Sequence, residues 1–233
     1  MQKTLFGSIL CSVLLPVLAH AATWSSSDKW ATWSNGGYKI ENDVWGSKPG
    51  PQSIWANSYH NWGFWANHSG GGIKAYPNVD KSVNIRVNSL RTCSSTFAAN
   101  TASGSHYDLA YDIWCNNSQY EIMVWANWSG TQPIAKSYNA QGVAVPDYTN
   151  VSIGGRTYNV YKGSNGSNAV FSFLMTSKTN SATVDIKSIL LWLNSKGWYS
   201  NPVLTKIQFG WEIISTPSGG ANYGVTNYGV TAY

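Results

Sequence analysis

Residues 119–128 read QYEIMVWANW, and segment 120–125 within them has the alternation of a β-strand. Side chains in a strand point to opposite faces with a period of two, so the two halves of the alternation are separated in space. One half is apolar throughout, which predicts contact with a core. The other half carries a carboxylate, a thioether and an indole, from Glu121, Met123 and Trp125, and this mixture favours a cleft.

The preceding segment, 108–114, divides in the same way. Leu109, Tyr111 and Ile113 form its apolar half, and Asp112 and Trp114 lie on the other. The connection between the two segments is short, which predicts antiparallel neighbours. Their cleft-facing side chains should then lie close together.

The rest of the chain indicates an all-β protein. From residue 24 onward, short alternating segments are separated by clusters of Gly, Pro, Asn and Ser, which predicts an antiparallel sandwich or barrel. Segment 181–197 is the exception, because its apolar residues recur at helical spacing. We expect one amphipathic helix on the outer face of a sheet, capped by Ser181 or Thr183 and ended by Gly197.

The first 21 residues have the features of a secretory signal peptide. Lys3 precedes an apolar stretch at 5–18, and small residues at 19 and 21 form a cleavage site. The alternative, a membrane anchor, fits less well because the apolar stretch is shorter than the roughly 20 residues that span a bilayer. The sequence therefore predicts a secreted, extracellular protein with a single domain at 22–233 and no membrane partner.

Cysteine use allows one disulfide. Cys11 belongs to the predicted signal peptide, which leaves Cys93 and Cys115. An oxidising compartment favours a bridge between them, on neighbouring strands around a turn at 102–105. Two separate buried thiols are the alternative.

Composition points toward carbohydrate. The net charge is +5 with 11% charged residues, and the few arginines are scattered, which is not typical of a nucleic-acid interface. The chain has 13 Trp and 14 Tyr, whose flat rings stack on the C–H faces of sugars. Sequons typical of a secreted glycoprotein begin at Asn67, Asn116, Asn127, Asn150 and Asn165.

Carboxylates supply the candidate chemistry. The chain has three glutamates; Glu41 lies in a polar, turn-like stretch, whereas Glu121 and Glu212 interrupt apolar strands. Burying a carboxylate is unfavourable unless it is paired or hydrogen-bonded, so each is either a satisfied structural group or a functional one. Two such glutamates with Asp112 and an aromatic cleft fit glycoside hydrolysis. Histidines lack metal-ligand spacing, and no nucleophile elbow or phosphate loop is found, so we expect no metal and no cofactor.

Several motifs together resemble glycoside hydrolase family 12, in family order across nearly the whole of 22–233. Segment 120–125 resembles the Tyr-Glu-(Leu/Ile)-Met-(Ile/Val)-Trp strand of that family, and 110–113 its Ala-Tyr-Asp-Leu strand. Segments 42–46, 73–78 and 132–134 are similar to its Asn-Asn-Leu-Trp-Gly, Val-Lys-Ser-Tyr-x-Asn and Gly/Gln-Pro-Ile motifs. Segment 208–212 resembles the Phe-Gly-Thr-Glu strand, with Trp211 in place of Thr.

The resemblance implies a two-sheet β-jelly roll with an open concave cleft for a β-glucan, and a retaining, endo-acting mechanism. It implies Glu121 as nucleophile, Glu212 as general acid/base and Asp112 as support for the nucleophile. Cleft residues for substrate binding would be Trp45, Met123, Trp125, Trp62, Trp65 and Pro133. We expect a monomer.

Three functional hypotheses follow from this reading. The first is an endo-β-1,4-glucanase acting on cellulose-type or mixed-linked glucan, and the second is an endo-β-1,4-glucanase specific for xyloglucan. The third, from another class, is a carbohydrate-binding sandwich without turnover. The cysteine pair found in many fungal family members is absent here, since 27–30 and 52–55 contain no cysteine.

Overall fold

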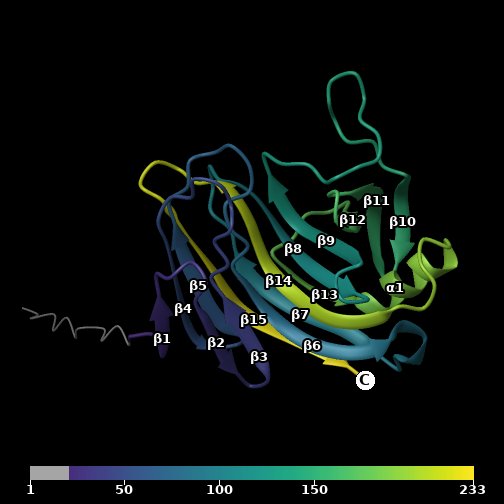
Figure 1. The fold of residues 1–233 in the computed structure, drawn as a ribbon, viewed down its shortest axis with the longest axis horizontal. Helices are drawn as coiled ribbons and strands as arrows, with labels where there is room; N and C mark the ends of the chain where they lie inside the picture. The colour runs from purple at the N-terminus through teal and green to yellow at the C-terminus, as the bar shows by residue number, and fades with distance from the viewer. Residues whose placement is uncertain (1–20) are drawn as a thin grey trace, which may run out of the picture.

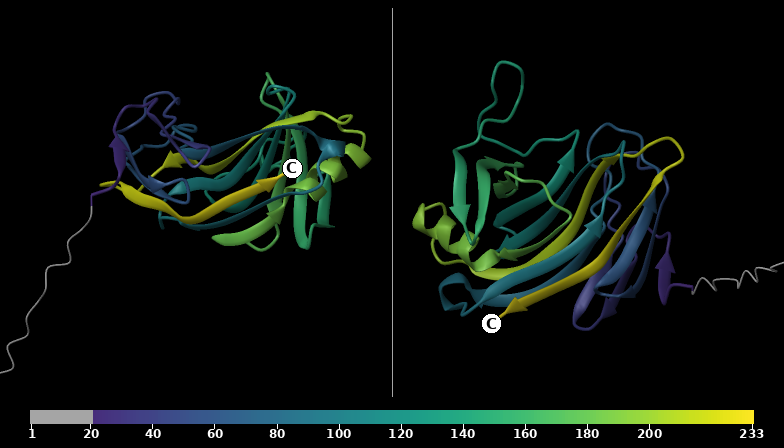
Figure 2. Two further views of the ribbon diagram at one scale, coloured as in Figure 1. Left: turned by 90° about the horizontal axis from the view of Figure 1, so that it is seen from below. Right: turned by 180° about the vertical axis from the view of Figure 1, so that it is seen from behind.

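The computed structural model describes residues 21–233 and has two large β-sheets, stacked as layers (Figures 1 and 2). The six-stranded sheet has the order β1 (Trp24–Ser26), β4 (Gln52–Ser58), β5 (Asn61–Ala66), β15 (Ala221–Ala232), β7 (Cys93–Asn100), β13 (Ser181–Asp185). The nine-stranded sheet has the order β10 (Tyr148–Ile153), β11 (Arg156–Ser164), β12 (Ala169–Met175), β9 (Tyr120–Ser129), β8 (His106–Cys115), β14 (Val203–Ser215), β6 (Asn78–Arg86), β3 (Tyr38–Glu41), β2 (Thr32–Asn35). The predicted all-β sandwich is confirmed.

One hydrophobic core lies between the sheets and follows from the alternation of their strands. The apolar half of each cleft strand enters this core, as with Tyr111 of β8, Val124 of β9 and Phe209 of β14, which are all fully buried. Complete burial of each such side chain contributes about 1.5–3 kcal/mol. The opposite half of the same strands is thereby held on the other face of the nine-stranded sheet, away from the core.

One pair of strands departs from the predicted antiparallel arrangement. β9 and β12 are parallel, with Glu121 opposite Val170. The chain leaves β9, forms the projecting loop at 130–147 and the β10–β11 hairpin, and re-enters the sheet at β12 in the same direction as β9 (Figure 1). A parallel pair requires such a long crossover, and this crossover builds one wall beside Glu121.

The predicted helix is present as α1 (Ile186–Ser195), preceded along the chain by the short 3-10 helix η1 (Val87–Ser89). The cap differs from the prediction: Asp185 accepts the backbone N–H of Ser188 at 3.0 Å, because Ser181 and Thr183 belong to strand β13. Gly197 follows the helix end with a φ of +66°, as expected for that position. The apolar face of α1 belongs to the inter-sheet core. The helix therefore packs on the core-facing side of the nine-stranded sheet, where it contacts β10 of that sheet and β7 of the six-stranded sheet.

The two cysteines correct another prediction. Cys93 begins β7 in one sheet and Cys115 ends β8 in the other, because the connection after Asn100 crosses between sheets and does not form a hairpin. Both are free thiols in the core, where burial raises each pKa to about 12. The structure therefore has the alternative arrangement, two buried thiols, in place of the predicted disulfide.

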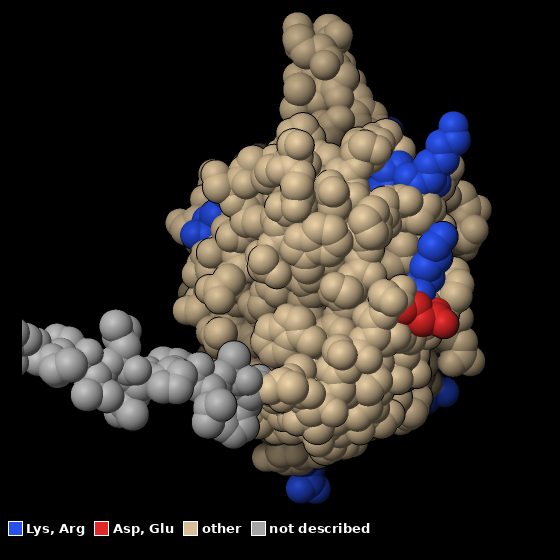
Figure 3. Space-filling model, turned by 90° about the vertical axis from the view of Figure 1, so that its left-hand side faces the viewer, with Lys and Arg blue, Asp and Glu red and all other residues tan. Residues whose placement is uncertain are grey.

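Charged side chains are few on the side of the molecule drawn in Figure 3, and Lys and Arg there are scattered. In residues 21–233 no helix is long and apolar enough to cross a membrane. The predicted signal peptide at 1–21 lies outside the described residues except for its last residue.

Candidate active site

A cleft of about 440 Å³ opens on the face of the nine-stranded sheet that points away from the core. Strands β8, β9 and β14 form its floor, and the segments after β3, before β6, after β9 and after β11 form its rims. Its lining residues are Asp43, Trp45, Ile73, Tyr76, Asp112, Trp114, Glu121, Met123, Trp125, Thr131, Gln132, Ile134, Asn165, Lys206, Gln208 and Glu212.

Strand β9 supplies Glu121, Met123 and Trp125 to this cleft, as its alternation predicts. Their neighbours along the strand pack into the inter-sheet core. Met123 and Trp125 form a small apolar cluster with residues of β8 and β12, so Glu121, a residue that is 8% exposed, has an apolar surface beside it. Burial in these surroundings raises the pKa of Glu121 to about 7.

Strand β8 lies antiparallel to β9, as predicted, with Trp114 opposite Glu121 and Asp112 opposite Met123. Asp112 is buried, at 5% exposure, and lines the same cleft. Burial, followed by the charge of Glu121, raises the pKa of Asp112 well above its usual range. The predicted closeness of these two carboxyls is therefore present.

Strand β14 carries Glu212 on the cleft face, four residues beyond Gln208 and two beyond Gly210. Gly210 is required there, because a Cβ at this position would collide with the carbonyl oxygen of Pro77 on the adjoining segment. Burial raises the pKa of Glu212 well above its usual range, and Asp108 and Glu121 raise it further. The environment of Glu212 thus favours the protonated form, which is the form that a general acid needs.

Asn165 is a cleft residue that the sequence analysis treated only as a sequon. It lies in the turn between β11 and β12, and its Nδ2 donates to Oε2 of Glu121 at 3.0 Å. A turn-forming Asn-Gly-Ser-Asn segment gives no local sign that one of its amides reaches the neighbouring strand. The contact depends on the parallel pairing of β9 and β12.

Trp45 stands on the rim between β3 and β4 and is 49% exposed. The segment that carries it is held by backbone bonds: Gly46 donates to the carbonyl of Lys74 at 2.9 Å, and Tyr76 to that of Asp43 at 2.9 Å. Asp43 has a φ of +43°, a conformation that Asp and Asn tolerate better than most residues. The indole is therefore presented to the cleft by a fixed loop.

Three other predicted substrate contacts are wrong. Trp62 is completely buried in the inter-sheet core, and Trp65 points to the outer face of the six-stranded sheet, where its ring lies against Gly220. Both belong to β5, which is a strand of the other sheet. Pro133 is buried behind the rim, and its neighbours Gln132 and Ile134 line the cleft instead.

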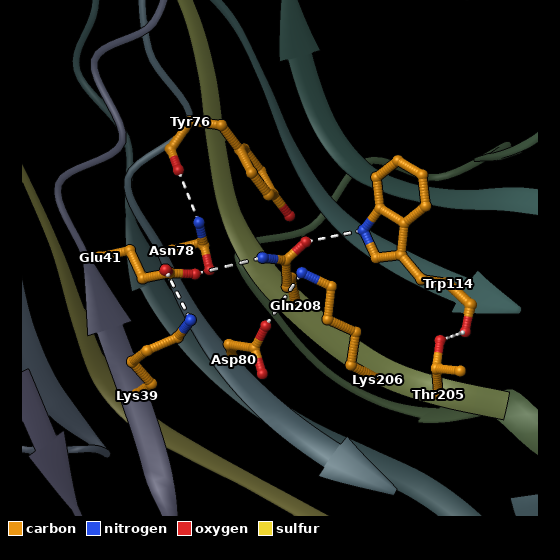
Figure 4. Close-up of polar contacts among 9 residues, drawn as sticks. All are labelled: Lys39, Glu41, Tyr76, Asn78, Asp80, Trp114, Thr205, Lys206 and Gln208. Carbon is orange, nitrogen blue, oxygen red and sulfur yellow. Dashed lines mark hydrogen bonds and ion pairs between the residues drawn. The ribbon is translucent and has the colours of Figure 1, made fainter. Parts of the chain in front are cut away.

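A polar row on the cleft floor was also missed (Figure 4). Gln208 accepts the indole N–H of Trp114 at 2.7 Å and donates to Glu41 at 3.3 Å. Lys206 pairs with Asp80 at 3.3 Å on the same floor. Glu41 is thus partly buried at the cleft edge, and the predicted solvated turn position is wrong.

Replacing Trp45 with Ala is expected to raise KM for a soluble β-glucan about tenfold, equivalent to about 1.4 kcal/mol of binding, with a much smaller change in kcat. The reason is the loss of a flat apolar surface for a sugar ring at a distance from the reacting bond. Initial rates over a range of substrate concentrations measure both constants.

The matched control for this variant is Trp65→Ala, because the structure assigns that indole to the opposite side of the sandwich. It should leave KM unchanged, with circular dichroism showing that both variants are folded. Equal effects on KM from the two substitutions would contradict the assignment of Trp45 to the cleft.

In residues 21–233 no group of three or more His, Cys, Asp or Glu side chains has an arrangement that could hold a metal ion. The side chains that line the cleft include carboxyls, amides and aromatic rings. Buried carboxyls whose pKa values are raised are suited to proton transfer, and a carboxylate is suited to attack on an electrophilic carbon.

Comparisons with known proteins agree with this chemistry. The family model described as "Glycosyl hydrolase family 12" matches residues 36–232. The solved xyloglucanase domain of NopAA from Sinorhizobium fredii, in complex with cellobiose, is 40% identical with a TM-score of 0.89, over 91% of this chain and 100% of that domain.

Two curated relatives match by sequence. A probable xyloglucan-specific endo-β-1,4-glucanase A from Aspergillus flavus is 29% identical, over 88% of this chain and 92% of its own length. Endoglucanase S from Pectobacterium parmentieri is 28% identical, over 91% and 89%.

Proposed function

Because the chain belongs to glycosyl hydrolase family 12, and is thus a glycosyl hydrolase of the endo-1,4-β-glucanase type, we propose that it is a retaining, endo-acting enzyme that cleaves internal bonds of xyloglucan. The single observation that supports this mechanism is the meeting of Glu121, Glu212 and Asp112 in one cleft. The names of similar proteins favour xyloglucan over the unsubstituted glucan that the sequence analysis placed first. Cellulose-type and mixed-linked glucans remain the second candidates.

In the first step, a carboxylate oxygen of Glu121 attacks the anomeric carbon while Glu212 gives its proton to the departing glycosidic oxygen. The amide of Asn165 holds Oε2 of Glu121, so the carboxylate is oriented before the sugar arrives. In the second step, Glu212 takes a proton from water, which attacks the glycosyl-enzyme and frees Glu121. Asp112 supports Glu121 from the neighbouring strand.

One time course tests reaction, stereochemistry and substrate together. Proton NMR of the products from xyloglucan, barley β-glucan and carboxymethyl-cellulose should show the β-anomer first, with the highest initial rate on xyloglucan. The α-anomer appearing first would contradict the retaining mechanism. Binding of all three glucans without release of reducing ends would favour the carbohydrate-binding hypothesis instead.

Replacing Asn165 with Ala is expected to move the acidic limb of kcat/KM upward by about 1 pH unit, so that activity well below the limb falls about tenfold. The amide hydrogen bond favours the ionised form of Glu121, and its loss raises a pKa that burial has already brought to about 7. The pH profile of kcat/KM measures the shift. Asn222→Ala, at an exposed asparagine of β15, serves as the control, and an unmoved limb in Asn165→Ala would contradict the proposed orientation of Glu121.

Secretion, glycosylation and a monomeric state remain proposals that rest on the sequence. Mass spectrometry of protein recovered from the culture medium should give Ala22 as its first residue, and light scattering should give the mass of one chain. A glycan on Asn165 would replace one of the two amide protons, which are given to Glu121 and Asn168, and would place a sugar in the cleft, so this sequon should be unmodified in active enzyme even where the others carry sugar.

A further inference from the structure

Asp108 is a buried acid that the reaction described above does not use. It lies on β8, directly opposite Glu212 of β14, and it is 1% exposed. Within residues 21–233, neither of its carboxyl oxygens receives a hydrogen bond from an N–H group or a hydroxyl. A buried ionised carboxylate without donors is strongly unfavourable, so its partner must be sought among the groups that it faces.

That partner is Glu212, which lies directly opposite Asp108 in the register of β14 and can share a hydrogen bond with it when one of the two carboxyls is protonated. Two ionised carboxylates cannot form a hydrogen bond, since neither has a proton to donate. The contact between them therefore requires one shared proton. Glu212 lines the cleft and Asp108 does not, so the proton that can reach a substrate is the one on Glu212, and Asp108 is its acceptor.

The charged surroundings reinforce this arrangement. The groups that act on the pKa values of the pair are other carboxyls, Asp112 on the same strand and Glu121 on β9. The hydroxyl of Tyr76, from the segment before β6, lies among them and donates to the carbonyl oxygen of Ala110 at 3.2 Å. The cleft lysine, Lys206, lies opposite Trp114 at the other end of the floor. Its charge is not one of those that shift the pKa values of Asp108 and Glu212.

We propose that Asp108 is a positioning residue for the reaction: it accepts a hydrogen bond from the protonated Glu212 and keeps that proton in place until substrate binds. This inference rests on the proposed role of Glu212 as acid/base. When Glu212 releases its proton to the leaving oxygen, the O–H bond breaks and two adjacent carboxylates remain. Their repulsion favours the return of a proton to Glu212, which the water of the second step supplies.

The test uses Asp108→Asn, which preserves shape but lets the side-chain amide donate to an ionised Glu212. The alkaline limb of kcat/KM should move to lower pH by about 1–3 units. The structural alternative, in which Asp108 only fills space, predicts lower stability with an unmoved limb. Asp112→Asn is the matched comparison, because Asp112 is also a buried acid of β8, but the carboxyl that acts most on its pKa is Glu121. This substitution should move the acidic limb more than the alkaline one.

A second measurement needs no substrate, and its first part uses the wild-type side chain at position 108. The chain has three glutamates, so labelling with glutamate carrying ¹³C at Cδ gives three carboxyl resonances, assigned with Glu41→Gln and Glu121→Gln. In the wild-type protein the Glu212 resonance should retain the protonated shift at neutral pH, and in Asp108→Asn it should titrate at lower pH. Titration of wild-type Glu212 near the ordinary glutamate pKa, or an unmoved resonance in the variant, would overturn the proposal. Activity retained by Glu212→Gln would instead overturn the proposed function.

Discussion

Glu121→Gln is expected to lower kcat/KM on β-glucan by at least about 10⁴-fold, with the protein still folded. The amide cannot attack the anomeric carbon, so the covalent step is lost while the cleft is kept. The hydrogen bond from Asn165 can still be made to the amide oxygen, which preserves the geometry of the site. Reducing-end release and thermal unfolding measure the two effects separately.

Azide distinguishes this role from that of an acid. In the truncated variant Glu121→Ala, added azide should enter the space of the missing carboxylate and give an α-configured glycosyl azide. Glu41→Gln is the matched control, since the third glutamate lies at the cleft edge, hydrogen-bonded to Gln208, and its loss should change kcat by less than about tenfold, or about 1.4 kcal/mol. Wild-type activity in Glu121→Gln would exclude it as the nucleophile.

Glu212→Gln is expected to lower kcat on β-glucan by about 10²–10⁴-fold. Without the acid, the departing sugar must leave as an alkoxide, whereas an aryl β-cellobioside with an acidic phenol needs little protonation. The loss should therefore be much smaller for the first step with the aryl substrate, and azide should then yield a β-configured product. A loss of the same size on both substrates would contradict the acid role.

Glu212→Gln should lower activity without lowering the stability of the fold. Burial raises the pKa of Glu212 in the folded protein above its unfolded value, so the associated stability is complete below the unfolded pKa and is lost as pH rises through the folded one. Gln is neutral at every pH, so the variant does not lose this stability as the pH rises. Glu212→Gln should accordingly unfold at the same temperature as wild type or higher in neutral and alkaline solution, which separates lost chemistry from misfolding.

Much of the cleft could be predicted from local pattern, because alternation within a strand is a short-range property. It indicated which side chains of β8 and β9 leave the core, and the resemblance to a family suggested their roles. Sheet membership is a long-range property, and the errors lie there. Trp62 and Trp65 were predicted to be cleft residues, but β5 belongs to the other sheet. The two cysteines were predicted to lie on neighbouring strands, but β7 and β8 lie in different sheets.

Pairing register explains what was missed. The sequence shows Asp108 directly, but its importance depends on the alignment of β8 with β14, which places it opposite Glu212, a residue more than a hundred positions later in the chain. Asn165 likewise needs the crossover between β9 and β12. Neither relation leaves a periodic signal, whereas the helix and the cleft faces do.

The parallel pairing of β9 also bears on how the chain avoids aggregation. Its edge toward β12 is open until residues 169–175 have emerged and returned through the crossover, and an open, strongly apolar strand is a template for pairing with other chains. Between Asp112 and Lys136, Glu121 is the one charged residue. A charge inside such a segment acts as a gatekeeper while the edge is exposed. Glu121 thus protects its own strand before the cleft exists, and Glu121→Gln should yield less soluble protein during refolding even though the finished fold tolerates it.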